Sequence, residues 1–290
     1  MEELRSTLSS IGMILAAMAA LAALEAAIPL HARAKWNRAH LAPNLALTFV
    51  TFVTNALMSA ALVVGLAAAE ARGLGLLNAF ALPAWASTGI VLLGLDFAFY
   101  VTHVAMHQLP AFWRFHRVHH ADPAVDVTTT IRQHPGEGLI RYAFLAAFAL
   151  PLGASPAAFA VYRSAVALFG LLEHANLRVP RRLGQLLSLV VTWPDVHKVH
   201  HSRDTRFTDT NYGNLVSWWD RGFGTFTPAR EGRAVAYGLD GFDDPAVQTT
   251  AGLLALPFRG PATSPSLRPA CAPSSSPARR PASALRRADA

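Results

Sequence analysis

The sequence predicts an all-α integral membrane protein, and three observations support this fold class. Hydrophobic residues make up 52% of the 290 residues and charged residues 15%, which is more apolar than a soluble domain of this length requires. The apolar residues gather in stretches long enough to cross a bilayer as helices. Most of the histidines lie in the polar regions beyond these stretches. We therefore expect four to five membrane helices and a helical cap that gathers the histidines.

Three span-length stretches occupy the N-terminal part of the chain. Residues 9–30 form the first, residues 45–69 form a cleaner second, and residues 79–100 form a third that ends just before the first clustered histidine. The first stretch has acidic residues on its flank and a second span soon after it, which favours a retained helix over a cleaved signal peptide. We expect residues 1–89 to form an N-terminal unit of membrane helices.

Charge and connectivity predict the side of the membrane on which the histidines lie. The loop after the first span carries Arg33, Lys35 and Arg38, so the positive-inside rule places it in the cytoplasm. The third span then returns the chain to the cytoplasm at His103. An even number of crossings must follow before the later histidines, so we expect a helical hairpin at about 139–172. Its first arm is short enough to end within the bilayer, so the predicted total is four or five membrane helices. This predicts a bacterial inner-membrane protein with a cytoplasmic cap.

The remaining segments are short or polar. Residues 183–192 are too short to cross and are expected along the membrane interface. Residues 229–260 form a C-terminal extension, and residues 261–290 alternate Pro, Ser, Ala and Arg, which predicts disorder. The tail's five arginines and one aspartate supply +4 of the formal +7 charge, which suits anionic lipid head groups. No aromatic or groove-reading pattern accompanies this charge, so we expect no nucleic acid partner. The single cysteine, Cys271, excludes a disulfide framework.

The spacing of the histidines indicates a metal site. Residues three and four apart share a helix face, and the chain has one HxxxH pair and two HxxHH triplets. Neutral imidazole is the commonest metal ligand in proteins. Packing alone explains such repetition poorly, because buried imidazole nitrogens need partners. The ten candidate residues are His103, His107, His116, His119, His120, His134, His174, His197, His200 and His201.

The number of histidines favours two metal ions over one. A single tetrahedral zinc needs three or four ligands and is signalled by CxxC or HExxH spacing, and neither occurs in the sequence. Iron suits nitrogen ligation with open positions, so we infer two Fe ions, and a di-zinc centre stays an alternative. A divalent-metal transporter would place its ligands in mid-span, and a bis-histidine haem protein would not use adjacent histidines. A transporter or a non-catalytic metal-binding membrane protein is the alternative function.

Several carboxylates and amides near the histidines are candidates for orienting the imidazole rings through hydrogen bonds. Asp96 precedes His103 by two helical turns and is expected to accept a hydrogen bond from a ring N–H. The other candidates of this kind are Glu137, Asn176, Asp195 and Asn211.

The histidine boxes stand in four characteristic stretches within residues 90–228. These are DFAFYVTHVAMHQLPAFWRFHRVHHADPAVDVTTTIRQHPGE, EHANL, WPDVHKVHH and TDTNYGNLVSWWDRGFGTF. In these stretches the chain resembles the fatty acid hydroxylase and sterol desaturase superfamily of membrane di-iron enzymes. The resemblance implies that residues 90–228 form the catalytic domain and that the ten histidines are its iron ligands. Members of the family often have Arg directly after the first histidine, whereas this chain has Val104.

The resemblance also implies an activity. It predicts an O₂-dependent oxidoreductase that hydroxylates or desaturates a C–H bond of a lipid, such as a sterol or a fatty acyl chain. Saturated C–H bonds are inert to acids, bases and nucleophiles, and the chain has no Ser-His-Asp order, P-loop or GxGxxG motif that would suggest other chemistry. No flavin, haem or ferredoxin motif is present, so an external electron donor of the cytochrome or ferredoxin type is expected.

Overall fold

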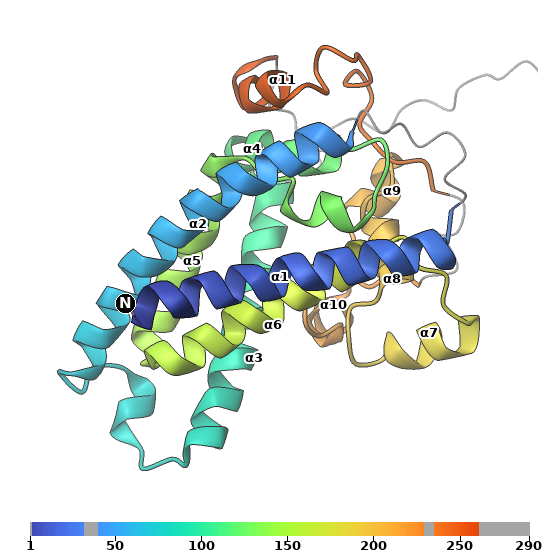
Figure 1. Ribbon diagram of the computed structural model, residues 1–290. Coiled ribbons are helices and arrows are strands. Elements are labelled where there is room, and N and C mark those ends of the chain that lie inside the picture. The colour runs from blue at the N-terminus through green and yellow to red at the C-terminus, as the bar shows by residue number, and fades with distance from the viewer. Residues whose placement is uncertain (1, 32–39, 229–234, 261–290) are drawn as a thin grey trace, which may run out of the picture.

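A computed structural model describes residues 2–31, 40–228 and 235–260, and within these ranges the chain is helical (Figure 1). The described residues contain no β-strand, only two isolated bridges. The all-α prediction is therefore confirmed. The Arg33–Arg38 loop and the tail 261–290 lie outside the described residues, so the predictions for them stay as predictions.

Within the described residues, three helices are long and apolar enough to cross a membrane. They are α2 (Leu41–Glu70), α3 (Ala84–Gln108) and α6 (Pro156–His174). The first predicted span falls in α1 (Glu2–Ala27), whose apolar part, Ile11–Ala27, is shorter than these three. The predicted count of four to five membrane helices is thus supported for three helices and stays a prediction for the rest.

The surface of α2 suits a lipid environment. Phe49, Val53, Leu57 and Val64 are exposed large apolar side chains at helical spacing along it. A soluble protein rarely exposes a continuous apolar stripe of this kind.

The helices α5 (Pro135–Leu152) and α6 are consecutive, but each packs mainly on other helices. The turn between them contains Gly153, which adopts a left-handed conformation, and Ser155, whose side chain caps α6. Helix α5 packs on α2 and α3, whereas α6 packs on α3 and on α1, which lies along it in Figure 1. The two arms of this hairpin therefore splay, and α3 contacts both of them.

Short helices form a cap at the end of the long helices where α3 and α6 finish (Figure 1). Proline occupies the first turn of α4, α5, α6 and α8, where its missing N–H costs nothing, and so helps to fix where each helix begins. The short elements are η1 (Leu76–Ala79) at the far end and, in the cap, α4 (Pro110–His120), η2 (Val127–Ile131), α7 (Arg181–Leu187), α8 (Pro194–His200), α9 (Thr205–Thr208), α10 (Trp218–Phe223), α11 (Thr250–Ala255) and η4 (Leu256–Phe258).

The C-terminal elements α11 and η4 pack on the cap side of the molecule, α11 against α2 and η4 against α4. Leu253 and Leu256 are buried in a cluster with Trp113 of α4. The guanidinium of Arg117 donates to the carbonyl oxygens of Leu256 and Arg259, each at 2.6 Å. These contacts hold the C-terminal extension against α4, the helix that carries three of the clustered histidines.

Candidate metal centre

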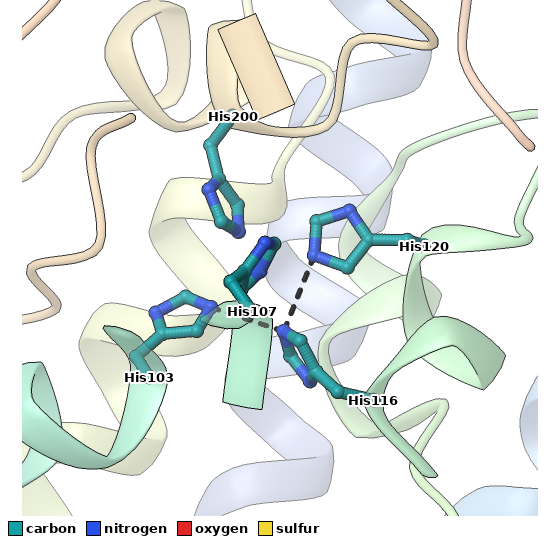
Figure 2. A group of neighbouring side chains, drawn as sticks. All are labelled: His103, His107, His116, His120 and His200. Atoms are coloured by element: carbon teal, nitrogen blue, oxygen red, sulfur yellow. Dashed lines mark hydrogen bonds between the residues drawn. The ribbon is translucent and has the colours of Figure 1, made fainter. Parts of the chain in front are cut away.

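Five buried histidines from three helices converge on one point, which we call site A. Two come from α3, one turn apart, two from α4, again one turn apart, and one from the end of α8. Figure 2 shows the five rings pointing toward one another. One ligand atom from each ring lies within 4.8 Å of the others. The members of site A are His103, His107, His116, His120 and His200.

Four other buried histidines converge on a neighbouring point, which we call site B. The Nε2 atom of His174, the last residue of α6, lies 3.0 Å from that of His119, 3.1 Å from that of His197 and 3.2 Å from that of His201. The rings of site B therefore come from α4, α6 and the C-terminal end of α8.

The two HxxHH triplets connect the sites. Neighbouring residues on a helix point about 100° apart, so the last two histidines of a triplet cannot aim at one point. His119 belongs to site B and His120 to site A, and their rings stand at 89° to each other. His200 belongs to site A and His201 to site B, again with rings at 89°. Each triplet therefore contributes to both sites, which holds the two sites at a fixed separation.

The hydrogen bonds of the rings determine which nitrogen faces inward. The Nδ1 atoms of His103, His200 and His174 lie 2.7 Å, 2.8 Å and 2.7 Å from the carbonyl oxygens of Tyr212, Thr210 and Gly170. A carbonyl oxygen only accepts, so each Nδ1–H donates and each Nε2 presents a lone pair to its site. These three rings are thus fixed in the tautomer that binds a metal.

The distances between the inward nitrogens fit a bound cation. Neighbouring Nε2 atoms are 3.1 Å and 3.2 Å apart in site A and 3.0–3.2 Å apart in site B. Nitrogens at right angles around a metal with bonds of about 2.1 Å lie about 3.0 Å apart. Lone pairs facing each other at this distance repel unless a cation lies between them, so the residues fit two metal ions.

Burial also keeps the ligands in the form that binds metal. It lowers the pKa of six imidazoles of sites A and B well below the ordinary value of 6.5, because the charged form loses its hydration. The rings are therefore neutral at physiological pH, as metal ligation requires. The rings concerned are His116, His119, His120, His197, His200 and His201.

A single loop, residues 209–212, orients three rings of site A. Besides the carbonyls of Thr210 and Tyr212, it supplies the Asp209 carboxylate, whose Oδ1 lies 3.2 Å from Nδ1 of His107. Burial raises the pKa of Asp209 to about 6. Sequence reasoning missed Asp209, although it stands in the TDTNYGN stretch beside the predicted Asn211.

Asn211 holds this loop in place without contacting a ring itself. Its φ of 55° is left-handed, a conformation that asparagine tolerates better than most residues. Its side-chain amide donates to the carbonyl oxygens of Val196 and Thr227, and its Oδ1 accepts from the backbone N–H of Thr227. Asn211 thus contacts backbone groups of the cap and no ring, so an orienting role for it would act through the backbone of this loop.

Two buried glutamates lie beside the rings. Oε1 of Glu137 is 3.2 Å from Nδ1 of His116 and accepts from the Arg141 guanidinium, so this predicted residue is placed at site A. Glu173 was not predicted, although it directly precedes His174. Its carboxylate oxygens lie 3.8 Å and 3.9 Å from the Nδ1 atoms of His174 and His197, and it accepts from Asn214.

The other three residues predicted to orient the rings have different partners. Asp96 accepts from the backbone N–H groups of Leu215 and Val216 and from the Trp219 indole, so it fixes the chain beyond the 209–212 loop. Two helical turns separate Asp96 from His103 by about 10 Å along α3. Asn176 exchanges hydrogen bonds with the backbone of His31. Asp195 lies buried in the first turn of α8, where the positive end of the helix dipole stabilises a carboxylate.

His134 lies apart from both sites. It caps the N-terminus of α5, where its Nδ1 accepts from the backbone N–H of Gly136 at 2.9 Å. Its Nε2 lies 3.2 Å from the carbonyl oxygen of Leu254 in α11 and donates to it. The structure therefore brings together nine of the ten predicted ligands and gives both ring nitrogens of His134 other partners.

A cavity of about 150 Å³ lies beside site B, between the splayed helices α5 and α6. The rings of His119, His174 and His197 form one part of its wall, and His103 of site A reaches it as well. Leu145 and other apolar side chains line much of the remainder. An apolar chain in this cavity would therefore lie next to site B.

The fold and the site define a class of protein, which is a helical protein with helices long and apolar enough to cross a membrane and with two adjoining histidine groups that fit metal ions. Comparison with known sequences gives the family. Residues 88–225 match the family model described as fatty acid hydroxylase, which confirms the resemblance noted from the histidine boxes.

Several curated relatives share this region. Alkylglycerol monooxygenase of Danio rerio is 34% identical over 150 residues, which is 52% of this chain and 32% of the relative. Ornithine lipid hydroxylase OlsE of Rhizobium tropici is 34% identical over 145 residues, or 49% and 43% of the two chains. Very-long-chain aldehyde decarbonylase CER1 of Arabidopsis thaliana is 30% identical over 161 residues, or 50% and 25%. The match spans less than half the length of each relative. No solved structure matches the chain.

Proposed function

We propose that this protein is a membrane-bound, O₂-dependent lipid hydroxylase whose sites A and B each hold one iron ion. The observation that carries the proposal is the convergence of nine buried imidazoles in two groups, one of which borders a largely apolar cavity. The relatives named as a monooxygenase of alkylglycerols and a hydroxylase of ornithine lipid favour hydroxylation over desaturation.

The bound iron would supply the redox chemistry that lets O₂ attack a saturated C–H bond. The protein's own residues perform the remaining tasks. The carbonyls of Thr210, Tyr212 and Gly170 hold three rings in the ligating tautomer. The HxxHH triplets fix the spacing of the two sites, and the buried cap keeps water away from them. The cavity holds one carbon of an apolar chain beside site B.

The surroundings of the site complete the proposal. The cap lies on the cytoplasmic side of a bacterial inner membrane, where an external cytochrome or ferredoxin donor delivers electrons to it. Residues 1–89 and the hairpin anchor the catalytic domain 90–228 in four or five membrane helices, and residues 229–260 cover the cap. The position of His174 at the very end of α6 supports an interfacial site, since a metal transporter would place its ligands in mid-span.

Oxygen-isotope labelling tests the proposed function. The purified chain is loaded with ferrous iron, supplied with a ferredoxin and its reductase, and incubated with a bacterial lipid extract under ¹⁸O₂. Mass spectrometry should find a lipid that gains one labelled oxygen. The His201→Ala variant should give no product. His31→Ala is the control, because the ring of His31 bonds Tyr237 away from both sites. Label derived from water, or an unchanged lipid profile with fully loaded protein, would contradict the proposal.

A further inference from the structure

One cation in the cavity, Arg163, has no acidic partner in the part of the chain that the structure describes. Apart from histidines, the arginine, lysine and acidic side chains that line the cavity are Arg141, Arg163 and Glu173. Arg141 is paired with Glu137 at 2.8 Å, and Glu173 accepts from Asn214. Among the described residues, Arg163 forms no ion pair and no hydrogen bond, and its guanidinium lies 5.2 Å from the centre of the Tyr142 ring.

The position of Arg163 makes this isolation costly. It lies within α6, one of the three helices long and apolar enough to cross the membrane. Charged residues in such helices normally face a cavity or a partner, because exposure to the hydrocarbon is unfavourable. Arg163 shares the face of α6 that lines the cavity, whereas Val161 and Leu168 are exposed on the surface. Its charge therefore points to a ligand inside the cavity.

Tyr142, which lies beside Arg163, offers a second polar group to the cavity. The hydroxyl of Tyr142 is buried, lines the same cavity and has no hydrogen-bond partner within the described part of the chain. A buried hydroxyl without a partner is unfavourable unless a ligand satisfies it. A guanidinium and a phenol hydroxyl next to each other offer several donors, which an anionic oxygen group accepts well.

We propose that Arg163 and Tyr142 bind the anionic group, a carboxylate or a phosphate ester, of an amphiphilic lipid whose apolar chain runs through the cavity toward site B. Calling this lipid the substrate rests on the proposed hydroxylase function, whereas its binding does not. Guanidinium recognises both anionic groups in a bidentate manner, so the two are alternatives within one chemistry. Neutral lipids of the same chain length lack the group that Arg163 and Tyr142 bind.

Helix α6 also sets the distance between the anionic group of the lipid and the carbon that is oxidised. Arg163 and His174 are eleven residues apart on α6, which is about 16 Å along the helix axis. The anionic group is therefore held away from site B, and oxidation should occur on the apolar chain at a carbon remote from that group.

Ligand binding by the purified full-length chain tests this proposal, with four probes that share one alkyl chain length. Hexadecanoate and hexadecyl phosphate carry the anionic group, and hexadecanol and 1-hexadecylglycerol do not. Affinities are measured by native mass spectrometry in neutral detergent, for metal-free and iron-loaded protein, at a pH where the carboxylate is ionised. At least one anionic probe should bind about tenfold or more tightly than the neutral probes. The stronger of the two identifies the head group as carboxylate or phosphate.

Variants assign the effect to the two residues. Arg163→Gln should remove the preference for the anionic probe, Arg163→Lys should keep part of it, and Tyr142→Phe should weaken it. Arg182→Gln, which changes an exposed arginine on α7, is the matched control and should bind like the wild type. Unchanged binding of hexadecanol by Arg163→Gln shows that this variant is folded.

Three results would overturn the proposal: equal binding of anionic and neutral probes, no binding of the anionic probes, or full anion preference in Arg163→Gln. If Arg163→Gln does not fold, a reduced anion preference in Arg163→Lys and Tyr142→Phe supports the proposal and an undiminished preference in both overturns it. Failure of the hydroxylase function appears separately, as absent ¹⁸O incorporation together with an intact anion preference.

Discussion

Each histidine ring of the centre has two nitrogens, and in several rings one nitrogen orients the ring while the other faces a metal position. His103, His174 and His200 donate through Nδ1 to backbone carbonyls, which belong to the fold and not to the metal. The lone pairs on Nε2 are therefore aimed before any metal binds. Such preorganisation lowers the entropy that metal binding must overcome.

At the residue scale, His134 provides the first prediction. His134→Asn should leave the metal content unchanged, because His134 belongs to neither site and asparagine also caps helices well. His134→Ala should keep the metals but lower the unfolding free energy by about 1 kcal/mol, through the lost cap of α5. Thermal unfolding and elemental analysis measure the two quantities. Loss of a metal equivalent in His134→Asn would place this histidine in the ligand set after all.

Sequence spacing predicted most of the candidate ligands, because HxxxH and HxxHH can only place rings on nearby faces of a helix. The division into five and four followed from the three-dimensional arrangement of α3, α4, α6 and α8, which spacing does not contain. His134 carried no sequence mark of its capping role, apart from the proline that follows it. Glu173 and Asp209 were missed because single carboxylates near histidines have no characteristic spacing.

At the element scale, the 209–212 loop links the fold to site A. Asp209, Thr210 and Tyr212 each contact one ring of site A, and Asn211 between them fixes the loop through its side chain. The loop therefore acts as one orienting unit for His107, His200 and His103.

The second prediction follows from the two properties of Asn211. Asn211→Ala removes its side-chain hydrogen bonds and places a less tolerant residue at positive φ, whereas Asn211→Gly removes only the hydrogen bonds. We expect the affinity for one metal equivalent to fall about 10–100-fold in Asn211→Ala and less in Asn211→Gly. Competition with a metal chelator measures this affinity. If both variants bound metal as tightly as the wild type, the loop would not orient site A.

The third prediction concerns the C-terminal elements α11 and η4. Leu253 is fully buried against the cluster around Trp113, so Leu253→Ala should lower the unfolding free energy by about 2–5 kcal/mol. Phe258→Ala nearby is the control and should have little effect, because Phe258 is 71% exposed. Thermal unfolding in detergent compares the two variants. A similar loss in both would show that α11 is not packed into the cluster around Trp113 as described.

At the scale of the whole molecule, composition and apolar stretches predicted a helical membrane protein, because a helix pairs the N–H and C=O groups of its own backbone in lipid. They did not predict that α5 and α6 splay apart. Which helices pack together depends on the shapes of their side chains, and both arms find their contacts on other helices, α5 on α2 and α3 and α6 on α3 and α1. The cavity between them, and the isolated Arg163 in its wall, were for this reason not visible in the sequence.

The fourth prediction tests the topology. Ala121 and Ala175, which adjoin the histidine clusters, are buried and would not react with a labelling reagent. Exposed positions on the cap serve instead, and in a Cys271→Ser background Arg178→Cys and Thr205→Cys should react only with reagent on the cytoplasmic side. Arg72→Cys, at the far end of α2, should react only from the opposite side. Labelling of Arg178→Cys and Thr205→Cys from different sides would contradict a single cap.

The central claim is that the chain holds two metal ions in two distinct histidine groups, and the metal content of matched variants tests it most directly. Elemental analysis of freshly purified, iron-loaded wild type should find about two iron ions per chain, as two groups of five and four nitrogens require. His120→Ala removes a ligand of site A alone and His201→Ala a ligand of site B alone, so each should keep about one equivalent. One equivalent or less in the fully loaded wild type, or identical two-metal contents in both variants, would contradict the account.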